Sequence, residues 1–243
     1  MRRSFRETRF TPLPETAREV HEIAAAWGDS SHTLVLTGAS ASEDALKSLA
    51  PGRRVLHLAT HGFFLDASRP SLPGREARGI GAVTSSGVPA GAQPPAVRES
   101  PLLISGLALA GANRRLRVRP DEEDGILMAQ EVASMDLSAA EWVVLSACDT
   151  GLGKVQAGEG VLGLRRAFEE AGAGSVLMSL WEVDDRASRA WMRELYEARF
   201  HRHRSTAESV RDADLQVLRN RRAQGFGSHP FYWAGFVATG DWR

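Results

Sequence analysis

Two residues of this chain have side chains suited to nucleophilic catalysis, and each directly follows an apolar, β-type run. The run RVLHLAT (54–60) leads into His61, and the run WVVLSA (142–147) leads into Cys148. A cysteine attacks efficiently only as its thiolate, and histidine is the side chain that takes up a proton near neutral pH. Because the carboxyl ends of parallel strands meet at one edge of a sheet, we expect His61 and Cys148 to lie close together there.

Glycines accompany both residues. Gly62 and Gly151 permit tight turns and leave backbone N–H groups exposed near the thiol, as an oxyanion hole requires. We expect the N–H groups of Gly62 and Cys148 to hold the oxyanion. The spacing alone leaves another interpretation open, in which Cys148 is a packed small apolar residue and His61 a structural histidine.

Alternating helices and strands must position this pair. We expect helices at 14–28, 42–50, 129–136, 160–172, 184–200 and 205–220, and strands at 32–38, 54–60, 142–147, 175–181 and 231–240. Such alternation predicts an α/β protein, with helices on both faces of a mainly parallel sheet.

The segment 66–100 interrupts this alternation. It contains five glycines, five prolines and five serines with almost no periodic apolar residues. A stretch of this kind predicts a flexible insertion, with a substrate-gating or cleavable loop as the alternative. The strand patterns on both sides of it indicate one domain over 14–243, preceded by an N-terminal tail over 1–13.

Composition excludes several function classes. Thirty basic and thirty acidic residues give no net charge, which argues against direct nucleic-acid binding. No apolar run approaches the ~20 residues that span a bilayer, and the basic start of the chain lacks the apolar stretch of a signal peptide. A single cysteine excludes a disulfide framework and a multi-cysteine zinc site, which favours a reducing, cytoplasmic setting.

The sequence contains no complete metal-binding or nucleotide-binding motif. His57 and His61 would lie about 13 Å apart on a strand at ~3.3 Å per residue, too far to share one metal ion. The run around Gly151–Lys154 lacks the first glycine and the final Ser or Thr of a phosphate loop. We therefore expect no metal and no cofactor, and a nucleotide-binding switch is a weak third candidate.

Several blocks, in order along nearly the whole chain, closely resemble the CHAT domain, a family of caspase-like cysteine peptidases. They are VLHLATHGFF (55–64), SPLLISGLALAGAN (100–113), DGILMAQEVASMDL (124–137), VVLSACDTGLG (143–153), GEGVLGLRRAFEEAGAGSVLMSLWEVDD (158–185) and HPFYWAGFVATGD (229–241). The resemblance implies a caspase-like three-layer α/β/α sandwich. It also implies a catalytic dyad in which His61 is the general base and Cys148 the nucleophile.

The resemblance further implies a specificity pocket beside the strand 175–181. Ser179 and Trp181 share one strand face by the two-residue alternation and would wall this pocket. Asp184 or Asp185 would then supply negative charge that selects a basic residue before the cleaved bond. In the alternative, both carboxylates only cap the helix that follows.

The sequence thus predicts a cysteine endopeptidase that acts on protein or peptide substrates. The alternative is a catalytically silent caspase-like interaction module. CHAT domains usually follow tetratricopeptide or other helical repeats, and this sequence shows none. We therefore expect regulation by oligomerisation or by a partner protein that carries helical repeats.

Overall fold

The computed structural model describes residues 8–28, 31–64, 100–119, 122–146, 159–181, 183 and 185–243. Residues 66–99 of the predicted insertion, together with Cys148 and Asp184, lie outside the described residues.

A four-stranded sheet forms the centre of the fold, with strand order β1-β5-β6-β7. Its strands are β1 (Val55–Leu58), β5 (Trp142–Leu145), β6 (Ser175–Ser179) and β7 (Phe236–Gly240). β1 and β6 both run parallel to β5, and β7 runs antiparallel to β6. The prediction of a mainly parallel sheet is confirmed.

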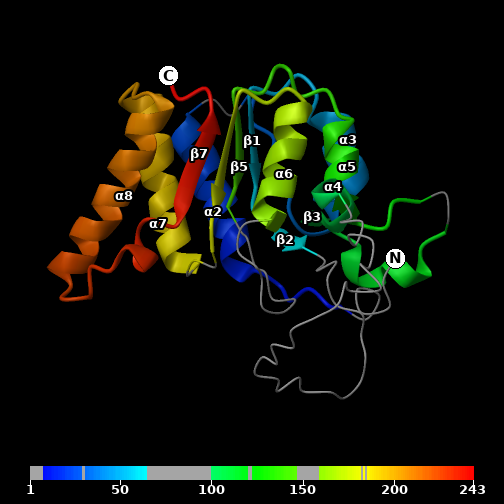
Figure 1. Cartoon of the computed structure of the whole chain (residues 1–243), viewed down its shortest axis with the longest axis horizontal. Coiled ribbons are helices and arrows are strands. Elements are labelled where there is room, and N and C mark those ends of the chain that lie inside the picture. The colour runs from blue at the N-terminus through cyan, green and yellow to red at the C-terminus, as the bar shows by residue number, and fades with distance from the viewer. Residues whose placement is uncertain are drawn as a thin grey trace, which may run out of the picture.

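Helices cover both faces of this sheet (Figure 1). One layer contains α2 (Pro14–Trp27), α7 (Asp185–Tyr196) and α8 (Thr206–Ala223); the other contains α3 (Glu43–Leu49), α5 (Ala129–Ala133) and α6 (Glu159–Glu170). A π turn, η3 (Glu197–His201), follows α7, and the short helix α4 (Pro101–Ile104) precedes the strand β3 (Ser105–Ala108). The three-layer α/β/α arrangement is therefore confirmed.

The strand β5 shows why the sheet needs both layers. All four of its residues are buried. Trp142 and Val144 pack with Trp191 of α7, whereas Val143 and Leu145 pack with Phe168 of α6 in a second cluster. Alternate side chains point to opposite faces, so a strand covered on both sides is a continuous apolar run.

A second, antiparallel sheet was not predicted. Its strands are β2 (His61–Phe64), β3 (Ser105–Ala108) and β4 (Ile126–Met128), in the order β2-β3-β4. Strands of three or four residues are too short to show a period in the sequence, and Gly106 breaks the apolar pattern of β3. That glycine is required, since a Cβ there would lie 2.6 Å from the carbonyl oxygen of Leu127.

The strand predicted at 32–38 is wrong. Thr33–Thr37 has no strand pairing among the described residues, and the 3₁₀ turn η1 (Gly38–Ser40) follows it. The β-rich composition of this segment is a local property, whereas a strand also needs a neighbouring backbone at hydrogen-bonding distance. The predicted final strand is likewise shorter, because the 3₁₀ turn η4 (Pro230–Tyr232) takes its first residues.

Candidate functional site

His61 lies at the carboxyl edge of the parallel sheet. The chain leaves β1 after Leu58 and enters β2 at His61 only three residues later. On the neighbouring strand, the N–H of Ser146 donates to the carbonyl of Leu58 at 3.1 Å, so the chain leaves β5 at the same edge. Cys148 follows Ser146 by two residues and lies outside the described residues, so its distance from His61 stays a prediction.

His61 belongs to a strand of the second sheet, although the sequence suggests only that it follows the strand β1. His61 is the first residue of β2, pairs with Ala108 of β3, and is only 6% exposed. The hydroxyl of Thr60 donates to the carbonyl of Ala108 and holds the connection from β1 to β2 against the second sheet. Gly62 is also buried in β2, opposite Leu107. The second sheet therefore fixes the backbone at the site.

One hydrogen bond defines the protonation pattern of the His61 ring. The Nε2 atom lies 2.6 Å from the backbone carbonyl oxygen of Thr11. A carbonyl oxygen can only accept, so Nε2 carries the hydrogen, and in the neutral ring Nδ1 is the nitrogen that can accept a proton. The arrangement therefore suits Nδ1 as the basic atom of the site.

The residues that approach His61 from the N-terminal side were not identified from the sequence. The ring of Phe10 lies 5.6 Å from the His61 ring and 6.0 Å from that of Phe63, centroid to centroid. Asn113 bonds the backbone of Phe10. An aromatic residue just before the extended, proline-flanked run TPLP (11–14) was the available signal that this segment packs against the domain.

His61 also borders open space. It lines a groove of about 1830 Å³ together with Phe10 and Thr11 from the N-terminal side. Residues of α2, α3 and β1 and of the 3₁₀ helix η2 (Ala112–Arg117) also contribute to the lining. His61 is therefore a buried residue of the second sheet that also lines a groove.

The predicted pocket residues lie at the end of β6. Ser179 is the last residue of this strand, is 2% exposed and pairs with Phe236. The ring of Trp181 stacks on that of Phe231 at 5.9 Å, and its Nε1–H donates to the Phe231 carbonyl at 3.0 Å. Asp185 begins α7.

The strand order separates these pocket residues from His61. β5 lies between β1 and β6, and all three are parallel, so Leu58 and Ser179 end at the same edge of the sheet. His61 and Trp181 thus flank the point at which the chain leaves β5. None of the described contacts joins His61 directly to Ser179 or Trp181.

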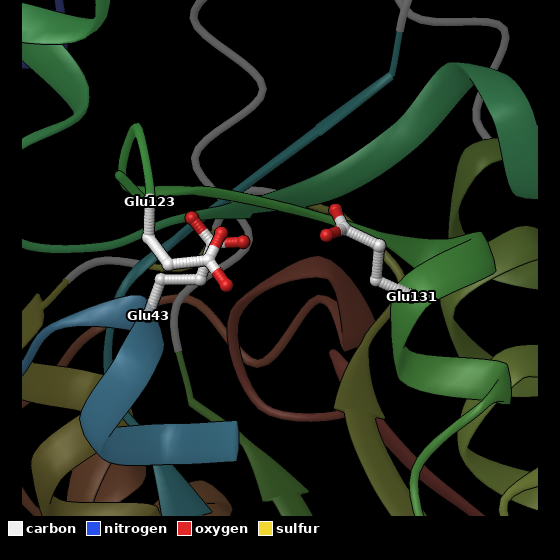
Figure 2. Close-up of side chains that lie close together, drawn as sticks. All are labelled: Glu43, Glu123 and Glu131. Atoms are coloured by element: carbon white, nitrogen blue, oxygen red, sulfur yellow. The ribbon is translucent and has the colours of Figure 1, made fainter. Parts of the chain in front are cut away.

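Three carboxylates gather near the start of α3, and two of them, Glu43 and Glu123, line the same groove as His61. Glu43, Glu123 and Glu131 offer oxygen atoms within 4.8 Å of one another (Figure 2). The ammonium of Lys47 lies 2.8 Å from each of them. Lys47 therefore supplies the positive charge that a metal ion would otherwise supply.

The charges in this cluster depend on each other. Burial raises the pKa of Glu43, and the hydrogen bond and charge of Lys47 oppose that rise. Burial disfavours the charged form of Lys47, but its hydrogen bonds to the three carboxylates outweigh this and raise the pKa of Lys47. We interpret the cluster as a structural ion-pair network that joins α3 to α5.

Two known proteins are similar to this chain in sequence. Tetratricopeptide repeat protein 28 of Mus musculus is 27% identical across 95% of this chain, and the human protein of the same name is 26% identical across the same share. The chain spans only 9% and 8% of those two proteins, respectively. Among the described residues, no helix is long and apolar enough to cross a membrane.

The family model of the CHAT domain matches residues 2–241, which is nearly the whole chain. The match covers both sheets and the helices around them, including the segment that contacts His61. The chain therefore belongs to the CHAT domain family and has that family's caspase-like α/β fold.

Proposed function

We propose that this domain is a cysteine endopeptidase in which Cys148 is the nucleophile and His61 the general base. The observation that carries the proposal is the hydrogen bond from Nε2 of His61 to the carbonyl of Thr11, which orients a buried imidazole. A nucleophile, a base and a third group that orients the base form the arrangement used in covalent catalysis. Membership of the CHAT family supports the same assignment.

The proposed reaction begins when Nδ1 of His61 takes the proton of the Cys148 thiol. The thiolate sulfur attacks the carbonyl carbon of the substrate peptide bond, and the backbone N–H groups of Gly62 and Cys148 stabilise the oxyanion. The C–N bond breaks, and His61 returns the proton to the leaving amine. Water, deprotonated by His61, then attacks the thioester and releases the acid and the free thiol. The chain and water supply every group that the reaction needs.

Substrate selection in this proposal depends on the end of β6. Ser179 and Trp181 wall the pocket for the residue before the cleaved bond, and Asp184 or Asp185 supplies negative charge to it. Acidic side chains at the start of α7 also complement the helix dipole, which is their alternative role. A peptide library separates the two roles: preference for Arg or Lys supports the charged pocket, and an apolar preference assigns selection to Trp181.

Recruitment in this proposal comes from a partner. The two relatives are named for tetratricopeptide repeats, and this chain matches only a small part of each. We therefore propose a regulatory protein with helical repeats, or self-association, as the source of activation, with a polypeptide substrate and a cytoplasmic location.

A peptide electrophile tests the reaction directly. The intact protein should be labelled once, at Cys148, and Cys148→Ala should remove the label. Because nucleophile and base act as a unit, Cys148→Ala combined with His61→Gln should be hardly less active than either single variant. Cleavage sites are then mapped by mass spectrometry on a proteome digest, with Cys148→Ala as the control.

The second candidate is a catalytically silent interaction module. The names of the two relatives describe repeats and no enzyme activity, which favours this candidate. A folded protein that neither reacts with peptide electrophiles nor cleaves any protein in the digest would establish it.

A further inference from the structure

We infer that Asn113 is a positioning residue for His61 and acts through residues 8–13, which we name the N-terminal strap. The inference rests on the proposed function, because it assigns a cause to the orientation of the proposed base. Asn113 lies on η2, and the strap lies between this helix and β2. No direct contact between Asn113 and His61 is needed.

Asn113 holds the backbone of Phe10 through both of its polar groups. The side-chain Nδ2 donates to the Phe10 carbonyl at 2.9 Å, and the Phe10 N–H donates to Oδ1 at 2.9 Å. A carboxamide is suited to this role because it offers a donor and an acceptor side by side. Since both polar groups of Phe10 are held, the chain has little freedom before it reaches Thr11, whose carbonyl accepts from His61.

Arg115 provides a second anchor on the same helix. Its Nη2 donates to the carbonyl of Thr8 at 2.6 Å, and its Nη1 donates to the carbonyl of Ala112 at 2.7 Å. The guanidinium carbon lies 5.9 Å from the centre of the Phe10 ring. Arg115 is 8% exposed, so this anchor is part of the packed interior.

The segment that runs from β3 to η2 supports both the N-terminal strap and the His61 imidazole. His61 pairs with Ala108, the last residue of β3, and η2 begins only four residues later at Ala112. The hydrogen-bond donor on the ring and the acceptor on the strap are therefore both held by the β3–η2 segment. A shift of the strap would move the Thr11 carbonyl away from Nε2 and release the ring to its other tautomer.

Asn113 suits a clean test, because its side chain is exposed and its truncation opens no cavity. In Asn113→Ala we expect kcat/KM to fall about tenfold, mainly through kcat, since the strap orients the base rather than binding substrate. Asn113→Asp keeps the acceptor for the Phe10 N–H but places a carboxylate oxygen against the Phe10 carbonyl, so it should lose at least as much kcat/KM as Asn113→Ala. Asn220→Ala is the matched control, because Asn220 accepts a side-chain hydrogen bond on the exposed surface of α8 and should change neither quantity.

A direct readout is the tautomer of His61, measured by long-range proton–nitrogen correlation spectra of the full chain with isotope-labelled histidine. The chain has seven histidines, and His61→Gln identifies the relevant signals. We expect an Nε2–H ring in the native protein and a mixture of tautomers in Asn113→Ala. An unchanged tautomer in Asn113→Ala would overturn the inference. This readout needs no turnover, so the absence of peptidase activity would refute the proposed function while leaving the positioning test intact.

Discussion

The Nε2 atom of His57 lies 2.7 Å from a carboxylate oxygen of Glu19, which is buried, and the His57 side chain is 10% exposed. The Nδ1 atom of the same ring lies 3.0 Å from the hydroxyl of Tyr196. A carboxylate accepts from Nε2–H, which leaves Nδ1 to accept from the phenol in the neutral ring. Burial, with a smaller contribution from Glu19, raises the pKa of Tyr196 and keeps this phenol protonated. His57 therefore joins β1 to α2 and α7.

We therefore expect replacement by glutamine to have different effects at His57 and at His61. His57→Gln breaks a buried network and should lower the free energy of unfolding by about 1–3 kcal/mol. It should leave electrophile labelling of Cys148 in place. His61→Gln should retain most of the stability and lose turnover. Urea denaturation, electrophile labelling and peptide cleavage by both variants check this, and a loss of labelling in well-folded His57→Gln would contradict the assignment.

The contact between Asp214 and Trp191 should make stability depend on pH. Trp191 Nε1–H donates to Asp214 at 2.8 Å, and burial raises the pKa of Asp214 from 3.8 to about 6 despite this bond. The native state then holds a proton that the unfolded chain loses, so this group destabilises the fold as pH rises from about 4 to about 6.

Asp214→Asn keeps the acceptor for Trp191 and removes the ionisation. Relative to the native protein, this variant should gain about 1–2 kcal/mol at pH 7.5, allowing for solvent screening of a half-buried group. The gain should vanish near pH 4. Denaturation midpoints of both proteins across this range provide the measurement, and parallel stability curves would contradict the prediction.

Replacement of Lys47, the cation of the three-carboxylate network, should lower the stability of the fold. Lys47→Met leaves Glu43 buried without its ammonium partner and should lower the free energy of unfolding by about 2 kcal/mol. Without Lys47 the pKa of Glu43 rises further, so the deficit should be larger at pH 8 than at pH 5.

The rescue variant for this network is Glu43→Gln in the Lys47→Met background. Glutamine has no charge to bury, and its amide oxygen can still accept from the Gly125 N–H, which lies 3.0 Å from Glu43. The double variant should recover part of the stability and lose the pH dependence. Urea denaturation of both variants at pH 5 and pH 8 provides the measurement. An equal loss of unfolding free energy at the two pH values in Lys47→Met alone would contradict the role of the network.

Gly235 should control the position of the Trp181 ring. A Cβ at this position would lie 2.7 Å from Val183 Cγ2 and 3.3 Å from Trp181 Nε1. Gly235→Ala should therefore shift the ring from its stack on Phe231 and change residue preference in the peptide library. Gly227→Ala is the matched control, because no heavy atom lies within 4 Å of its added carbon. Identical preferences in the two variants would exclude Trp181 as a pocket wall.

Much of the fold could be predicted from local patterns. Ser42 caps α3 by accepting from the N–H of Ala45 at 3.2 Å, and Gly28 ends α2 at a φ of 77°, as the residue types indicate. The apolar runs of β1, β5 and β6 predicted a parallel sheet, since strands buried on both faces have few polar positions. The failed strand at 32–38 shows the limit of this approach, because pairing depends on a distant partner.

For the site, the sequence alone determined which residues could do chemistry. His61 and Cys148 were assigned by their types, by their places after apolar runs and by family resemblance, all of which are local or collinear features. The His57–Glu19 pair and the contacts of Lys47 with Glu123 and Glu131 were not visible in this way, because each joins residues 38 or more positions apart.

Only the tertiary structure decided what holds His61. Thr11, Asn113 and His61 are separated by 50 or more positions in the chain, yet two neighbouring hydrogen-bond contacts connect them. The decisive groups are the carbonyls of Phe10 and Thr11, and a backbone carbonyl is the same in every residue. No residue type marks it, so its role appears only when folding brings a donor to it.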